Sequence, residues 1–189
     1  MTVYLSDTEI IALVMQGQKN EFSVLVSRYQ QAAYKLALVI LQQKADAEDA
    51  VSEAFIKAFT GLAGCRSDTN FKSWFLKITY NCCLDMLRKK KRSKLFADLN
   101  DSQESNLDRI TQPSPLQDLI EQENHEALWQ ALNKLSPEER AAITLKYYHE
   151  TSYQDIAAAL HWPLGTVASR LSRARDKLRS LYEGGRCDG

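Results

Sequence analysis

The chain has 189 residues, of which 44% are hydrophobic and 25% charged, and its 24 basic and 24 acidic side chains give a formal net charge of zero. This composition is too apolar for a chain that is disordered throughout, and the length accommodates two small domains. Glycine and proline are few, and strong helix formers fill the segments between them, which favours an all-α fold. No run approaches the ~20 apolar residues of a membrane span, and no basic segment followed by an apolar one opens the chain, so we expect a cytoplasmic protein with no membrane insertion of its own.

The sequence carries no pattern typical of a metal site or a catalytic centre. The cysteines are Cys65, Cys82, Cys83 and Cys187. They form no C-x-x-C pair, and no histidine stands at ligand spacing, so we expect no metal. The sequence also lacks a Gly-rich phosphate loop, a nucleophile elbow and a paired-carboxylate cleft, so we expect neither an enzyme nor a cofactor.

Charge is segregated along the chain. Between Arg66 and Lys94 nine basic residues face two acidic ones, and between Asp98 and Glu126 eight acidic residues face Arg109 alone. Basic character then returns near the C-terminus, at Arg170, Arg173, Arg175, Lys177 and Arg179. Two cationic stretches separated by an acidic connector predict two contacts with a polyanion, because each neutralised phosphate releases counterions.

Helical periodicity predicts four helices in the first half. Ser6-Asp-Thr-Glu9 is a capping box, and the helix that it opens should end at Gly17. A second helix, capped by Asn20, should reach Leu41, and a third should run from about 46 to 61. A fourth begins at 71 and ends in the basic run Arg88 to Arg92, where cations suit the helix dipole.

A polar segment divides the chain. From 93 to about 117 Asp, Asn, Ser, Gln and Pro dominate, a composition that buries little apolar surface. We therefore expect a domain over 1–94, a flexible acidic linker over 95–122 and a second domain over 123–183. In the second domain Ser136-Pro-Glu-Glu139 is a strong helix start, with proline in the first helical position.

The C-terminal third has the pattern of a helix-turn-helix, over 152–181. Ser152-Tyr-Gln-Asp155 starts a short apolar helix, and His161-Trp-Pro-Leu-Gly165 forms a turn before the next helix. That helix has an apolar back at Val167, Leu171 and Ala174 and a front of small and basic residues, as a helix in the major groove requires. The alternative is an ordinary helical hairpin with a solvated basic face.

Several motifs together resemble one protein family. Leu135-Ser-Pro-Glu-Glu-Arg, Tyr153-Gln-Asp-Ile-Ala and Pro163-Leu-Gly-Thr-Val-Ala-Ser-Arg-Leu-Ser-Arg-Ala-Arg resemble region four of bacterial sigma factors of the extracytoplasmic-function (ECF) type. The segments 48–59 and 71–81 resemble region two of the same family. The resemblance covers almost the whole chain in the family's order, and it implies a sigma factor that directs core RNA polymerase to promoters of a stress or envelope-response regulon.

The resemblance implies a role for each matched residue. Region two would bind the clamp helices of the polymerase's largest subunit through Glu48, Asp49, Ser52, Glu53, Phe55 and Lys57. It would open the minus-ten element with Asn81, which would hold a flipped base, and with Arg88, Lys89, Lys90, Lys91 and Arg92 against phosphates. Region four would meet the polymerase flap region and read the minus-thirty-five element with Thr166, Ala168, Ser169, Arg170, Ser172, Arg173 and Arg175. An anti-sigma factor is implied as a further partner.

Two positions depart from the family's pattern, and several residues have simpler interpretations. Ser52 replaces the usual glutamine, which puts one polymerase contact in doubt, and Ala168 replaces a frequent basic residue, which affects the minus-thirty-five preference. Glu48, Asp49 and Glu53 could merely complement a helix dipole. A cluster of five like charges without acidic partners favours an anionic ligand over a solubilising helix end. The alternative for the whole chain is a stand-alone regulator with an N-terminal sensing or dimerisation domain.

Overall fold

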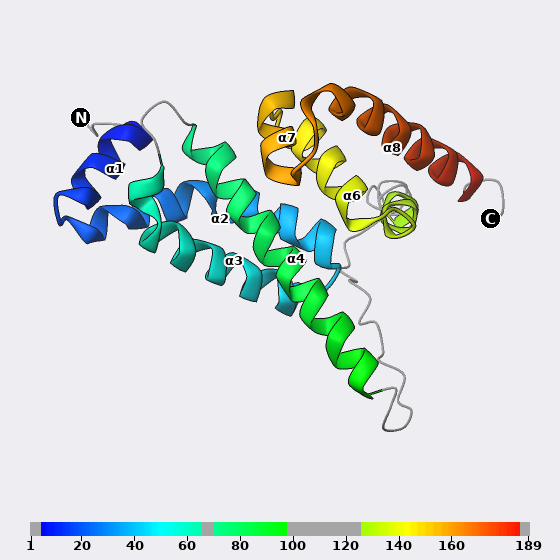
Figure 1. Ribbon diagram of the computed structural model, residues 1–189, viewed down its shortest axis with the longest axis horizontal. Helices are drawn as coiled ribbons and strands as arrows, with labels where there is room; N and C mark the ends of the chain where they lie inside the picture. Colours follow the sequence, from blue (N-terminus) through cyan, green and yellow to red (C-terminus); the bar gives the residue numbers. More distant parts are fainter. Residues whose placement is uncertain (1–4, 66–69, 98–125, 186–189) are drawn as a thin grey trace, which may run out of the picture.

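A computed structural model describes residues 5–65, 70–97 and 126–185, and every regular element in these ranges is helical. The expected all-α fold is therefore confirmed. None of the helices in these ranges combines the length and the apolar character that crossing a bilayer requires. Figure 1 shows two groups of helices side by side, with α4 extending far beyond both.

The N-terminal bundle, formed by the described residues between 5 and 97, contains α1 (Asp7–Met15), η1 (Lys19–Glu21), α2 (Phe22–Leu41), α3 (Lys44–Thr60), η2 (Leu62–Gly64) and α4 (Phe71–Ala97). The predicted capping box is present, since the Ser6 amide donates to Glu9 Oε2 at 2.7 Å and the Glu9 amide donates to Ser6 Oγ at 3.3 Å. The prediction that Asn20 caps the second helix is wrong. Asn20 lies inside η1, which leads directly into α2, and its backbone carbonyl accepts a hydrogen bond from Ser23 Oγ at 2.7 Å.

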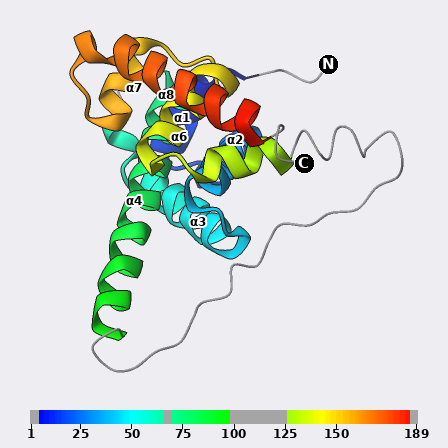
Figure 2. The same cartoon turned by 90° about the vertical axis from the view of Figure 1, so that its right-hand side faces the viewer.

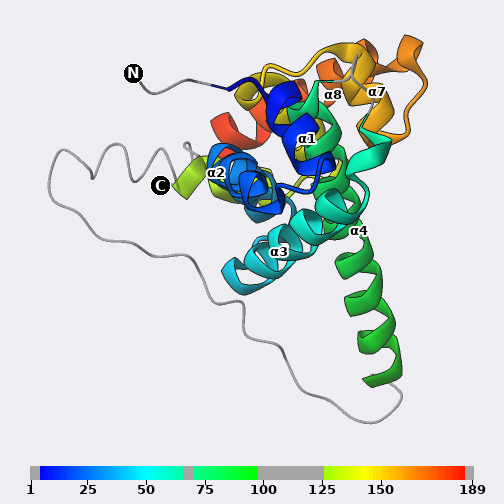
Figure 3. The same ribbon diagram turned by 90° about the vertical axis from the view of Figure 1, so that its left-hand side faces the viewer.

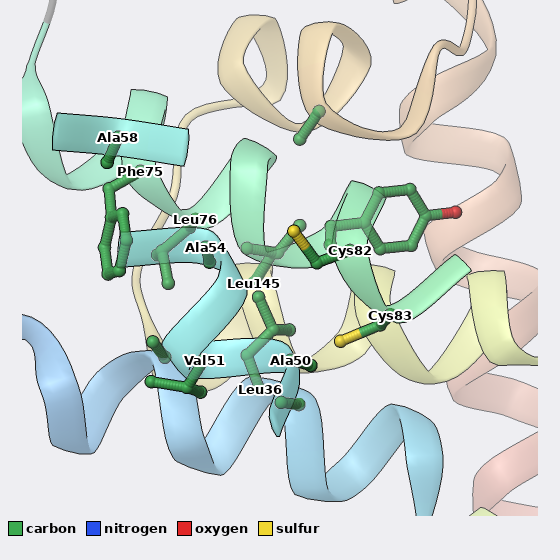
Figure 4. Close-up of a cluster of buried hydrophobic side chains, with 14 of the residues drawn as sticks. Leu36, Ala50, Val51, Ala54, Ala58, Phe75, Leu76, Cys82, Cys83 and Leu145 are labelled. Atoms are coloured by element: carbon green, nitrogen blue, oxygen red, sulfur yellow. The ribbon is translucent and has the colours of Figure 1, made fainter. Parts of the chain in front are cut away.

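Small residues allow α3 to pack closely against α2 and α4. Ala47, Ala50, Ala54 and Ala58 recur at helical spacing on α3, and each is completely buried. Figure 4 shows three of these alanines among the apolar side chains of the neighbouring helices. Phe75 from α4 is buried in the same core.

The C-terminal bundle, residues 126–185, begins with a helical segment over 126–133. It continues with α6 (Pro137–Ile143), the π-helical turn η3 (Thr144–Tyr148), α7 (Tyr153–Leu160) and α8 (Leu164–Gly185). Ser136 and Ser152 act as N-caps, as predicted, and each accepts a hydrogen bond from the amide three residues later. His161 ends α7 in a left-handed conformation, with φ of 54°, and so turns the chain toward α8.

The two bundles are docked against each other. Helix α7 packs on α4 and α6 packs on α2, an arrangement that can be followed in Figures 2 and 3. The buried core is continuous between them, because Leu145 of η3 belongs to the same cluster as Leu36 and Cys82 (Figure 4). The predicted linker over 95–122 lies outside the described residues, apart from 95–97, which continue α4.

Candidate nucleic-acid interface and partner surface

Helix α8 separates an apolar back from a small and basic front. Val167, Leu171 and Ala174 are at most 3% exposed, and through them the helix packs on α6 and α7. Of the predicted DNA-contacting residues, Ala168, Ser169, Arg170, Arg173 and Arg175 are exposed, while Thr166 and Ser172 are half-buried. All seven lie outside the buried back of α8, spread around the rest of the helix, and the small and basic side chains among them have the chemistry of a helix that enters the major groove.

The hydroxyl groups on this face hydrogen-bond locally. Thr166 Oγ1 donates to the Pro163 carbonyl at 2.8 Å, and Ser169 Oγ donates to the Thr166 carbonyl at 3.0 Å. Each hydroxyl oxygen still has acceptor capacity, and the side chains lie flat against the helix. A nucleic acid can therefore approach closely here.

The arginines of α8 have different partners. Arg173 Nε donates to the Ser169 carbonyl at 3.3 Å, and Arg175 pairs with Asp176 at 3.2 Å. Arg179 pairs with Glu183 at 2.8 Å. Arg170 instead lies over the indole of Trp162, with 4.7 Å between the guanidinium carbon and the ring centroid. Sequence reasoning identified Arg170 but assigned Trp162 only to the turn.

Two members of the basic run on α4 have acidic partners. Arg88 pairs with Asp85 at 3.0 Å, and Lys90 contacts Asp46 at the start of α3 and donates to Gln43 Oε1 at 2.9 Å. The inference that all five charges lack acidic partners is therefore wrong. Asp46 is distant in sequence and approaches Lys90 only because α3 packs beside α4.

The rest of the run is exposed on the projecting half of α4. Lys89, Lys91 and Arg92 are exposed, and α4 extends away from both bundles in Figures 1, 2 and 3. Like charges on such a projection repel one another, and a polyanion would relieve that repulsion. These three residues are the better placed candidates for phosphate contact.

Asn81 stands on α4 one turn before Asp85 and two turns before Arg88. Residues at this spacing share one face of a helix, so the asparagine and the start of the basic run face the same side. Asn81 is half-buried, and its amide makes no hydrogen bond to any other residue that the structure describes. A primary amide has both donors and an acceptor, so it can bind the edge of an extruded base.

The outward face of α3 mixes acidic and apolar groups. Glu48, Asp49 and Ser52 are exposed on it. Because α3 begins at Lys44, the two acidic residues fall in its second turn, where the dipole effect has largely faded. Complementing the helix dipole therefore explains little of their presence.

The other predicted polymerase-binding residues already have partners within the N-terminal bundle. Phe55 is half-buried and stacks on Phe75, with ring centroids 4.3 Å apart. Lys57 pairs with Glu53 at 2.8 Å and lies 3.9 Å from Asp85 of α4. The contacts of Phe55 with Phe75 and of Lys57 with Asp85 link α3 to α4, while the pair of Lys57 with Glu53 lies within α3.

Ile56 is an exposed apolar residue that sequence reasoning missed. Its side chain is 66% exposed, next to the acidic residues of α3, and Phe59 one turn later is 36% exposed. The sequence could have revealed it, because Ile56 does not fall on the side of the helix that carries the buried alanines. An exposed apolar centre with polar groups at its edge fits the apolar core and polar rim of a protein-binding surface.

Comparison with known proteins assigns the chain. The family described as Sigma-70 region 2 matches residues 25–93, and the family described as Sigma-70, region 4 matches residues 125–178. The ECF RNA polymerase sigma-E factor of Haemophilus influenzae is 30% identical over 187 residues, which cover 97% of this chain and 98% of that protein. This chain belongs to the ECF family of RNA polymerase sigma factors. The sigma-E factor of Escherichia coli K12 is 31% identical, over 94% of this chain and 95% of its own.

The solved structure of another sigma factor has a similar fold. The sigma factor RpoE from Bartonella quintana, crystallised in complex with the anti-sigma factor NepR, matches with a TM-score of 0.70 and 29% identity, over 86% of this chain and 97% of its own. As a sigma factor the chain directs RNA polymerase to promoters and starts transcription. The alternative of a stand-alone regulator is thereby removed.

Proposed function

We propose that this sigma factor binds core polymerase through α3, engages the minus-ten element through α4 and docks α8 in the major groove at the minus-thirty-five element. In this assignment region two spans 1–94, the linker 95–122 and region four 123–183. The main support for the proposal is that α8 has a buried apolar side and an exposed basic side. Its back is almost completely buried at Val167, Leu171 and Ala174, while Arg170 and Arg173 on its front remain exposed.

The polymerase contact is assigned to the outward face of α3. Exposed Glu48 and Asp49 supply polar contacts to the clamp helices, and Ile56 supplies apolar surface that is buried on binding. Ser52 is shorter than the glutamine typical of the family, so its contact is lost or mediated by water. Region four meets the flap region in the same complex.

The minus-ten contact is assigned to one face of α4. Opening a duplex exposes unpaired bases, and their capture by a protein stabilises each by about 1–3 kcal/mol. The unpartnered amide of Asn81 binds an extruded base, while Lys89, Lys91 and Arg92 hold the adjacent phosphates. Arg88 and Lys90 contribute less, because each is partly neutralised by a carboxylate.

Regulation is proposed by analogy with the solved relative, which was crystallised with an anti-sigma factor. An anti-sigma factor that covers α3 or α8 would withhold the chain from polymerase until a stress or envelope signal releases it. The chain acts in the cytoplasm, where polymerase and chromosome are found. It has no catalytic step of its own, and the polymerase performs the chemistry.

Reconstitution with core RNA polymerase tests the proposal. The holoenzyme is used to select promoters from a random duplex pool, and the selected promoters are transcribed in runoff assays. We expect selection at two separate elements, and we expect Arg173→Ala to relax selection only at the upstream one. The proposal would be contradicted if the chain bound the selected DNA tightly without polymerase. It would also be contradicted if the polymerase gained no promoter-specific transcription from the chain.

A further inference from the structure

Trp162 and Arg170 form a cation–π pair at the entrance to α8. Trp162 lies in the turn between α7 and α8, where its backbone amide donates to the Ala157 carbonyl at 2.9 Å. The indole is half-buried and packs against the core cluster, so its ring is held in place. The guanidinium carbon of Arg170 lies 4.7 Å from the ring centroid, within the range of a cation–π interaction.

Helix geometry explains how the two side chains meet. Arg170 is the seventh residue of α8, almost two turns from its start. Because Cα–Cβ bonds tilt toward the N-terminus of a helix, a long side chain in the second turn extends back over the first. The arginine therefore reaches the turn, where the indole is located.

Arg170 pairs with an aromatic ring and not with a carboxylate, so no described anion competes with a ligand for it. Arg175 and Arg179 direct their guanidinium groups at carboxylates, which compete with phosphate. Among the described residues Arg170 makes neither an ion pair nor a side-chain hydrogen bond, and its contact is with the indole of Trp162. A guanidinium group has five N–H donors, and none of those of Arg170 donates to a described residue, so they remain available to a phosphate or a base.

We propose that Trp162 is a positioning residue, which holds the guanidinium of Arg170 over the turn so that it meets the minus-thirty-five DNA already oriented. Arginine has many rotamers in solution, and fixing one of them before binding removes part of the entropic cost. The inference rests on the proposed contact of Arg170 with DNA. It adds that this contact depends on a residue outside the DNA-reading face.

A double-mutant cycle tests the coupling. Holoenzyme reconstituted from the full chain and core polymerase is titrated with the selected promoter and with the same promoter carrying a scrambled upstream element. The full chain carries Trp162→Leu, Arg170→Gln or both. We expect Trp162→Leu to weaken binding to the selected promoter about two- to fivefold while Arg170 is present, and to have no further effect once Arg170→Gln is in place.

Matched variants distinguish positioning from other roles. Arg179→Gln removes an arginine of the same helix that pairs with Glu183, so Trp162→Leu should weaken binding equally with or without it. Trp162→Phe keeps an aromatic face and should recover part of the affinity. It also replaces Trp162→Leu in the cycle if thermal unfolding shows that the leucine variant does not fold.

The outcomes separate this inference from the proposed function. If Trp162→Leu costs as much with Arg170→Gln as without it, the tryptophan acts through its own DNA contact or through packing. The positioning role is then wrong, and the DNA contact of Arg170 stands. If Arg170→Gln alone leaves binding to the selected promoter unchanged, the proposed contact and the positioning role fail together.

Discussion

Arg140 of α6 donates a hydrogen bond from Nη2 to the carbonyl oxygen of Ile40, at 2.9 Å, and so caps the C-terminal end of α2 from the other bundle. The last carbonyls of a helix have no partner within it, and a basic side chain is a favourable one. Arg140 is only 6% exposed, and Nη1 also donates to the Leu135 carbonyl at 3.1 Å. Burial lowers the pKa of this guanidinium, and its charge is stabilised by the carbonyl dipoles of both bundles.

Arg140→Ala should loosen the docking of the two bundles. The substitution leaves the Ile40 and Leu135 carbonyls without their donor, and such a loss costs about 1–3 kcal/mol for a buried acceptor. Urea unfolding should show the loss, and hydrogen exchange should show faster opening of the amides in α6. Arg179→Ala, at an exposed position of α8, is the control and should change stability by no more than about 0.5 kcal/mol. Equal effects of the two variants would exclude a special role for Arg140.

His149 gives the chain a stability that depends on pH. The imidazole is 4% exposed and Nε2 has no partner among the described residues, while Lys72 donates to the His149 backbone carbonyl at 3.1 Å. Burial, with the nearby charges of Lys72 and Lys35, lowers the pKa of His149 from 6.5 to about 4. Between these values the unfolded chain binds more protons than the folded one, so stability is complete above pH 6.5 and falls as the pH falls toward 4.

The expected loss between pH 7 and pH 5 is about 2 kcal/mol, measured as the free energy of unfolding in urea. His149→Phe keeps an aromatic ring in the same site and removes the titration. The free energy of unfolding of this variant should therefore fall by about 2 kcal/mol less than that of the wild type between pH 7 and pH 5. A wild-type and a phenylalanine variant with the same pH profile would assign the acid sensitivity to other groups.

The helices and the exposed basic residues of α4 and α8 could be predicted from the sequence, because periodicity and capping are local signals. The capping boxes at Ser6 and Ser136 needed only residues within one turn. The docking of the bundles could not be predicted in this way, since Arg140 and Ile40 are 100 residues apart. The pairing of Lys90 with Asp46 was missed because the two residues are also far apart in the sequence. The contact of Arg170 with Trp162 was missed because it depends on how the turn places the indole.

The basic run should contribute unequally to the salt dependence of promoter binding. Lys91→Gln removes an exposed charge, and a lost phosphate contact should reduce the slope of log K against log salt by about 0.9 on duplex DNA or about 0.7 on a single strand. Lys90→Gln removes a charge that Asp46 already partly neutralises, so it should reduce the slope less. Filter-binding of the holoenzyme over a range of salt concentrations measures both. Identical slopes for wild type and Lys91→Gln would remove this residue from the interface.

Ile56→Asp should prevent assembly with core polymerase without unfolding the chain. Its side chain is 66% exposed, so a carboxylate there is solvated in the free chain but would be buried and unpaired in the complex. Co-purification with core polymerase should fall at least tenfold, with the melting temperature nearly unchanged. Gln31→Asp, at an exposed position of α2, is the control for added charge. Normal assembly of the Ile56 variant would place the polymerase contact elsewhere.

Arg173→Ala should weaken binding to the selected minus-thirty-five element by about 1–3 kcal/mol, the usual value of a bidentate contact to a base. The arginine is exposed on α8, and its only described hydrogen bond, from Nε to the Ser169 carbonyl, leaves both terminal nitrogens free to reach a guanine edge. The loss should disappear when the upstream element is scrambled, because a base contact depends on sequence whereas a phosphate contact does not. A loss of equal size on every sequence would assign Arg173 to the phosphate backbone and leave the base preference to Ala168, Ser169 and Ser172.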